Sequence, residues 1–205
     1  NQILFSQFLR DWLDVKQTTV ELNTYVSYKS TVEQFVVPYF DERFPGLKLT
    51  EVTAKHIQDY YTYEMKVRKV SSNTVKHRHA SINNALKYAV RMDLIPSNPA
   101  NKVELPRLGK YNASYYNEKE LGALFELVKG TSLELGVFLA AYYGLRRSEA
   151  VGLRWDAIDF DRKTITIKHT AMDIYDEGQH YLVLKDRTKT KSSYRTLPLV
   201  APFEE

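Results

Sequence analysis

Apolar side chains recur three and four positions apart through four stretches of the first hundred residues, which is the spacing of one helix face. The pattern predicts four helices whose apolar and aromatic faces pack together as one core, with no strand in this part of the chain. The positions that define these faces are Phe5, Phe8, Leu9, Trp12 and Leu13, then Tyr25, Tyr28, Val32, Phe35 and Val36, then Ile57, Tyr60, Tyr61 and Met65, and finally Val75, Ile82, Leu86 and Ala89.

Prolines and capping residues predict where these helices begin and end. Pro38 is expected to end the second helix, because proline breaks the interior of a helix. Thr53 is the predicted N-cap of the third helix, and Ser71 directly precedes the fourth. The fourth helix is expected to end near Ile95, because the proline that follows disfavours helical conformation in the residue before it.

The pattern changes in the second half of the chain. Residues 106–116 lack periodicity and contain proline and glycine, so we interpret them as a linker between two domains. Asn117 and Glu120 have the spacing of a capping box at the start of a helix, and a very apolar helix over residues 133–143 is expected to end at Gly144.

Alternation of apolar and polar residues then predicts strands. Residues 164–168 alternate with a period of two, and residues 181–184 and 194–200 are predicted as two further short strands, joined by a basic turn at 185–193. The expected fold class is mainly α with a small antiparallel β-sheet of three strands. We assign residues 1–105 to a helical domain and residues 117–205 to a mixed α+β domain.

Composition narrows the class of protein. Among 205 residues, 43% are hydrophobic and 26% are charged, which is typical of globular rather than disordered chains. The absence of cysteine excludes a disulfide scaffold, a cysteine-ligated zinc site and thiol catalysis. No apolar run approaches the roughly 20 residues that span a bilayer, and no signal peptide is visible. We therefore expect a cytoplasmic protein that does not bind membranes.

The formal charge of +4 is unevenly distributed. Residues 65–92 contain seven basic residues and no acidic one, and a second basic cluster over residues 185–195 is interrupted only by Asp186. A run of one sign favours a polyanionic partner, although an ordinary solvated surface can produce the same pattern.

The fourth predicted helix carries a polar face opposite its apolar face, with the small residue Ala80 at its centre. Cations on this face can pair with phosphates, and amides can hydrogen bond to base edges. Duplex DNA is therefore the predicted partner of this face, which is formed by Lys76, His77, Asn83, Asn84, Lys87 and Arg91.

Two motifs in the second half resemble those of one family. Gly144-Leu-Arg-Arg-Ser-Glu149, followed by Leu153-Arg-Trp155, resembles the first catalytic box of tyrosine recombinases, also called phage integrases. Residues 188–199, Thr-Lys-Thr-Lys-Ser-Ser-Tyr-Arg-Thr-Leu-Pro-Leu, resemble the lysine-bearing hairpin of the same family. The first hundred residues resemble its helical, SAM-like core-binding domain. The resemblance covers essentially the whole chain, and it is closest to integrases of phages and conjugative transposons of Gram-positive bacteria.

The resemblance implies roles for three residues. Arg146 matches the first catalytic arginine, whose guanidinium stabilises the negative charge of the phosphoryl transition state. Lys189 matches the catalytic lysine, a general acid toward the leaving 5′ oxygen, and it is preferred over Lys185 and Lys191 because only it occupies the motif position. Glu149 lies one helical turn after the arginine and is expected to orient the site. A simple ion pair of Arg146 at a helix end is the alternative.

The resemblance also implies parts that these residues do not contain. The family uses a His-x-x-Arg box and a tyrosine nucleophile, but none of the five histidines is followed by arginine three residues later. Tyr194, the single tyrosine after Lys189, lies inside the second motif. We therefore expect a piece of a longer integrase that binds DNA without cleaving it, needs no cofactor or metal, and forms a tetramer on DNA only at full length. A non-catalytic DNA-binding regulator and a type IB topoisomerase are the alternatives.

Overall fold

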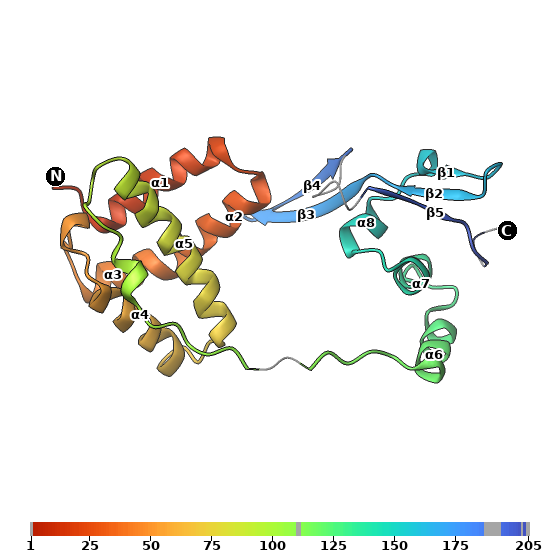
Figure 1. Ribbon diagram of the computed structural model, residues 1–205, viewed down its shortest axis with the longest axis horizontal. Coiled ribbons are helices and arrows are strands. Elements are labelled where there is room, and N and C mark those ends of the chain that lie inside the picture. The colour runs from red at the N-terminus through yellow and green to blue at the C-terminus, as the bar shows by residue number, and fades with distance from the viewer. Residues whose placement is uncertain (1, 110–111, 187–193, 202, 204–205) are drawn as a thin grey trace. The chain divides into compact units, whose positions relative to one another are not determined.

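The computed structural model describes residues 2–109, 112–186, 194–201 and 203 (Figure 1). The chain divides into two compact units, Asn1–Asn112 and Ala113–Glu205. The first unit is helical, and the second combines helices with small antiparallel sheets, so the predicted fold class is confirmed. Within the described residues, no helix combines the length and the apolarity that crossing a membrane requires.

Helices account for almost all regular structure of the first unit. Its core contains Trp12, Ile57, Ile82 and Leu86, each with no exposed side-chain surface, as the apolar periodicity predicted. The elements are α1 (Phe5–Thr19), α2 (Leu22–Thr31), the π-helical turn η1 (Val32–Val36), α3 (Val37–Arg43), the 3₁₀ turn η2 (Leu49–Glu51), α4 (Ala54–Lys66), α5 (Ser72–Arg91) and the 3₁₀ turn η3 (Pro99–Lys102).

The predicted end of the second helix at Pro38 is wrong. Helical backbone continues from α2 through η1 into α3, and Pro38 lies in the first turn of α3. The π-helical turn widens the helix directly before the proline, so that the proline occupies the start of a new α-helical segment. A missing N–H costs little at that position, which is why the chain does not break there.

The starts of α4 and α5 follow the prediction, whereas the end of α5 does not. Thr53 and Ser71 cap the two helices, accepting the backbone N–H of His56 and Thr74. Helix α5 ends at Arg91, four residues before Ile95. Asp93 adopts a left-handed conformation with φ 54°, its N–H donates to Val90 O, and the N–H of Leu94 donates to Ala89 O at 2.9 Å. This Schellman motif ends the helix before the prolines act.

The described part of the second unit contains three α-helices and two small antiparallel sheets. Strands β1, β2 and β5 form an antiparallel sheet in that order, and β3 pairs with β4 in a separate two-stranded ribbon (Figure 1). The elements are α6 (Glu118–Val128), α7 (Glu134–Tyr143), α8 (Arg147–Val151), the 3₁₀ turn η4 (Trp155–Ala157), β1 (Ile158–Asp159), β2 (Thr164–Ile167), β3 (Thr170–Asp176), β4 (Gln179–Lys185) and β5 (Arg195–Pro198).

The strand pairing corrects the predicted single sheet of three strands. The strand predicted at residues 181–184 is part of β4, whose partner is β3, and β3 was not predicted. Its buried residues, Ala171 and Ile174, are three positions apart, so β3 lacks the alternation by which a strand is recognised in sequence. The basic turn predicted at 185–193 lies largely outside the described residues.

The three-stranded sheet has two chemically different faces. Ile165 and Ile167 of β2 are buried with Leu139 of α7 and Leu199 in the core of the second unit. Thr166 and Thr196 lie on the opposite face, where their hydroxyl groups are 3.0 Å apart. Because successive side chains of a strand point to opposite faces, each residue of β5 is assigned to one face by its register.

Candidate functional site

Arg146 lies in the sharp turn between α7 and α8. Gly144 ends α7 in a left-handed conformation with φ 61°, and its N–H donates to Ala140 O at 3.0 Å. Glycine adopts this conformation without steric cost, which explains its position in the Gly-Leu-Arg sequence. Leu145 is buried in the core, and Arg146 then becomes the N-cap of α8. The turn thus fixes the backbone of Arg146 while its side chain stays 68% exposed.

A buried carboxylate holds the arginine in place. Glu149 is 2% exposed and accepts two hydrogen bonds from Arg146, one from the backbone N–H at 3.0 Å and one from Nη1 at 2.9 Å. The same carboxylate accepts a hydrogen bond from Nη2 of Arg195 at 3.1 Å. Glu149 therefore links the backbone and side chain of Arg146 to Arg195, and it joins α8 to β5.

Opposing effects act on the pKa of Glu149. Burial by itself raises the pKa of the carboxyl, but hydrogen bonds from Arg195 and from the backbone and side chain of Arg146 lower it below its ordinary value. Glu149 is therefore ionised at neutral pH. Its single negative charge faces the guanidinium groups of Arg146 and Arg195.

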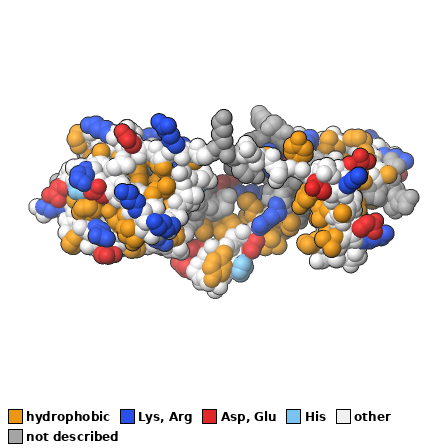
Figure 2. All heavy atoms as spheres, turned by 90° about the horizontal axis from the view of Figure 1, so that it is seen from below, with side chains coloured by type: hydrophobic (Ala, Val, Ile, Leu, Met, Phe, Trp, Pro, Cys, Tyr) orange, Lys and Arg blue, Asp and Glu red, His pale blue; other side chains and the backbone are white. Residues whose placement is uncertain are grey.

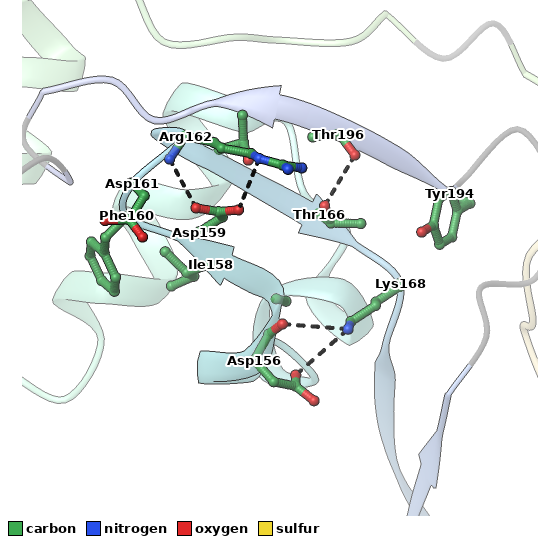
Figure 3. Close-up of a pocket in the computed structure, with 12 residues that line it drawn as sticks. Asp156, Ile158, Asp159, Phe160, Asp161, Arg162, Thr166, Lys168, Tyr194 and Thr196 are labelled. Carbon is green, nitrogen blue, oxygen red and sulfur yellow. Dashed lines mark hydrogen bonds and ion pairs between the residues drawn. The ribbon is translucent and has the colours of Figure 1, made fainter.

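Arg195 and Tyr194 lie on different faces of the three-stranded sheet. Arg195 pairs with Ile167, whose side chain is buried on the inner face, and it reaches Glu149 from there. Tyr194 lines the outer groove with Thr166 and Thr196, as Figure 3 shows. The hydroxyl of Tyr194 consequently lies on the side of the sheet opposite to the Arg146–Glu149 cluster.

Among the described residues that line this outer groove, each Lys or Arg lies beside a carboxylate. Lys168 lies 3.9 Å from a carboxylate oxygen of Asp156, and Arg162 lies 3.8 Å from one of Asp159 (Figure 3). Each cation is thus neutralised by a neighbouring carboxylate, and Asp161 adds a further negative charge to the lining. This groove is a poor candidate for binding a nucleic acid.

Of the three lysines considered for the general acid, the structure describes one. Lys189, the predicted general acid, and Lys191 lie outside the described residues. Lys185, the third lysine considered, is half-buried at the end of β4. The role of Lys189 therefore stays a prediction.

The polar face predicted on the fourth helix lies at the surface on α5. His77, Ala80, Asn84, Lys87 and Arg91 are exposed, and Lys76 and Asn83 are half-buried. On the face that Figure 2 presents, Lys and Arg side chains of the first unit are interspersed with apolar and acidic ones.

The two amides of this face already make hydrogen bonds within the protein. Oδ1 of Asn83 accepts a hydrogen bond from Asn98 Nδ2 at 2.6 Å, and Nδ2 of Asn84 donates to the hydroxyl of Tyr28 at 3.1 Å. A bidentate contact to adenine needs both atoms of an amide. These hydrogen bonds therefore weaken the assignment of Asn83 and Asn84 as base readers.

Two residues of the basic run over 65–92 point inward. Arg78 is buried, its guanidinium lies 3.9 Å from the centre of the Phe35 ring, and it forms an ion pair with the fully buried Glu64. His79 lies 2.8 Å from the hydroxyl of Tyr61, and its pKa is lowered by burial and by the nearby charge of Lys87. Counting charges along the sequence therefore overestimates the basic surface.

Sequence reasoning did not single out two residues that the structure brings to these sites. Arg195 was counted in a basic cluster and lies in the second motif, but no role was assigned to it, although it shares Glu149 with Arg146. Lys16, which lies 71 positions before Lys87, lines the same groove as Lys87 and Arg91. Neither contact has a local sequence signal, because both join residues far apart in the chain.

The sequence of this chain is similar to those of integrases and tyrosine recombinases. Residues 4–105 match the model of the phage integrase SAM-like domain. A tyrosine recombinase XerC-like protein of Caldanaerobacter subterraneus is 26% identical over 96% of this chain and 52% of its own length. The prophage ps2 probable integrase of Lactococcus lactis is 26% identical over 95% of this chain and 51% of its own length. The chain thus spans about half the length of these relatives.

The fold is also similar to that of solved integrases. The Tn1549 transposon integrase, in complex with a circular intermediate DNA, superposes with a TM-score of 0.74 at 17% identity, covering 97% of this chain and 62% of that one. A lambda integrase dimer bound to a COC′ core site gives a TM-score of 0.67 at 15% identity, covering 89% and 49%. At such low identity these similarities concern the fold.

Proposed function

Because the chain belongs to the tyrosine recombinase family, we propose that it is part of a site-specific DNA recombinase acting in the integration or excision of a mobile element. In this proposal, residues 1–105 form the DNA-binding domain, residues 106–116 a linker, and residues 117–205 the first part of the catalytic domain. The proposed partner is duplex DNA carrying the recombination sites, and the proposed compartment is the cytoplasm. Full-length copies assemble as a tetramer on that DNA.

The proposed catalytic role rests on the contact between Arg146 and the buried carboxylate of Glu149. The buried carboxylate takes one side of the guanidinium, while 68% of the side-chain surface faces solvent. A guanidinium oriented in advance can bind two oxygens of a scissile phosphate without reorganising as negative charge develops. Arg146 would thus stabilise the transition state of strand cleavage.

The second catalytic group in this proposal is Lys189. Cleavage by a tyrosine forms a bond from its oxygen to phosphorus and breaks the bond from phosphorus to the 5′ oxygen. That leaving oxygen must gain a proton, which a lysine ammonium can donate. The assignment of Lys189 rests on its position in the second motif.

The nucleophile is not among these 205 residues in our proposal. Tyr194 lies on the outer face of the three-stranded sheet, whereas Arg146 and Glu149 lie toward the inner face. No histidine is followed by arginine three residues later. We therefore infer that this chain by itself binds duplex DNA without forming a covalent intermediate.

The cationic part of the α5 face supplies the proposed contact with DNA. Lys76, Lys87 and Arg91 can pair with backbone phosphates, and His77 is exposed beside them. Because Asn83 and Asn84 are engaged within the protein, phosphate contacts rather than base contacts dominate this surface. Binding is then expected to depend strongly on salt and weakly on sequence.

Two measurements on the 205-residue chain test the proposal. Fluorescence anisotropy with labelled duplex DNA should give binding that weakens as salt is raised, and a chain that does not bind duplex DNA at low salt contradicts the DNA-binding function. A nicked duplex that traps covalent intermediates should yield no protein–DNA adduct with this chain. An adduct at Tyr194 would contradict the placement of the nucleophile outside these residues.

A further inference from the structure

The first unit carries an open groove of about 720 Å³ between α1, α5 and the segment that leads into η3. Three of its lining residues are cations, Lys16 from α1 and Lys87 and Arg91 from α5, and none is acidic. Among the described residues, none of these three cations forms an ion pair. The groove therefore gathers positive charge from two helices without a carboxylate to balance it.

The cations are positioned by aromatic side chains. Nζ of Lys16 lies 5.6 Å from the centre of the ring of Trp12, which has no exposed surface, and the guanidinium of Arg91 lies 5.8 Å from that of Tyr88. These cation–π contacts restrain the charged ends of both side chains, which line the groove.

The third wall of the groove is held by a buried amide. Asn98 is 6% exposed, donates to Oδ1 of Asn83 at 2.6 Å and accepts the N–H of Ala100 at 2.9 Å. These bonds fix the segment before η3 against α5. Ser97 and Asn101, on either side of Asn98, then add a hydroxyl group and an amide to the lining.

We propose that this groove binds a backbone phosphate of duplex DNA, and that Lys16 is a phosphate contact outside the α5 face. The proposal rests on the DNA-binding function proposed above. Cations surrounded by neutral hydrogen-bond donors match the anionic oxygens of a phosphate. The amide of Asn84, bound to Tyr28, is not available for bidentate contact with a base. The groove thus anchors the DNA backbone without reading its sequence.

Lys16 and Arg91 also lie in the last turns of their helices. A cation there offsets the negative end of the helix dipole and stabilises the fold. That role predicts a loss of stability on substitution with no change in the salt dependence of DNA binding. The two roles are therefore separated by measuring both quantities.

The test compares Lys16→Gln with wild type in binding to two duplexes of unrelated sequence, each over a range of salt concentrations. The slope of log K against log salt is negative, and losing one phosphate contact reduces its magnitude by about 0.9. Raising salt from 50 to 200 mM should then weaken wild-type binding about 3.5-fold more than variant binding, equally for both duplexes. Lys16→Arg keeps the charge and should keep the wild-type slope.

The matched control is Lys55→Gln on α4. Lys55 is exposed, pairs with Asp59 at 2.7 Å and does not line the groove, so its removal should leave the slope unchanged. If Lys16→Gln retains the wild-type slope while Lys76→Gln reduces it, the groove is not a DNA contact, although the proposed function stands. If wild type binds neither duplex, both are overturned. A Lys16-dependent stabilisation by inorganic phosphate without any effect on DNA binding would assign the groove to free anions and overturn the proposal.

Discussion

Replacing Glu149 by glutamine tests the arrangement on which the proposed catalytic site depends. The substitution keeps the shape of the side chain and removes its charge. Glutamine can still accept the backbone N–H of Arg146, as in many capping boxes. The hydrogen bonds from the two guanidinium groups lose their charged acceptor, and the amide nitrogen would face one of the donors.

The expected loss follows from the exposure of each partner. Arg195 is 27% exposed and Glu149 is 2% exposed, so this charge-assisted hydrogen bond is expected to contribute about 1.5–3 kcal/mol. The bond from Arg146, which is 68% exposed, is screened by water and should add at most about 1 kcal/mol. Glu149→Gln should therefore lower the free energy of unfolding of the second unit by roughly 2–4 kcal/mol at pH 7.

The pH dependence gives a second, independent signature. Because the pKa of Glu149 is lowered in the folded state, its contribution is complete above its unfolded pKa and is lost as pH falls through the folded value. The difference between wild type and Glu149→Gln should stay constant near neutral pH. It should shrink as pH falls below the ordinary carboxyl pKa of 4.5.

Hydrogen exchange of the amides of α8 and β5 in a urea series reports the second unit separately from the first. Glu126→Gln is the matched control, because Glu126 is exposed on α6 and makes none of these contacts. Equal exchange in Glu149→Gln and Glu126→Gln at pH 7 would refute the view that the Glu149 carboxylate holds both arginines. A difference that persisted unchanged at pH 3 would show that charge is not the cause.

Four further predictions concern binding, catalysis and packing. Reversing the charges of Lys76 and Lys87 should weaken binding to duplex DNA and reduce the magnitude of the slope of log K against log salt by about 1.8. An unchanged slope would remove these residues from the interface. In a longer protein that includes the nucleophile, Arg146→Ala should preserve DNA binding and slow covalent cleavage by about 10²–10³. Sulfur in place of the 5′ bridging oxygen should rescue Lys189→Ala but not Arg146→Ala, and the opposite pattern would exchange the two roles. Gly152→Ala should destabilise the second unit by about 1–3 kcal/mol, because the added Cβ would lie 2.5 Å from Ala171 N, whereas Gly109→Ala, with nothing within 4 Å, should be tolerated in thermal unfolding.

Local patterns in the sequence determined the helices and their starts. Thr53, Ser71 and Asn117 each cap a helix by accepting an N–H three residues later, so the signal and the structure lie within one turn. The apolar face of α5 was equally predictable, because its period depends only on helix geometry. The motif around Arg146 likewise places Glu149 within reach, three residues away.

Tertiary structure alone decided which charges act together and which are withdrawn from the surface. Arg78 is as basic as Lys87 in the sequence, but Glu64 and Phe35 draw it into the core from other helical segments. Arg195 joins Glu149 across 46 positions, and Lys16 reaches the groove of Lys87 from α1. The sequence likewise did not determine that β4 pairs with β3 rather than with β5, because strand pairing joins separate segments of the chain. Periodicity and capping record interactions between near neighbours, whereas the environment of a charge depends on segments brought together only when the chain folds.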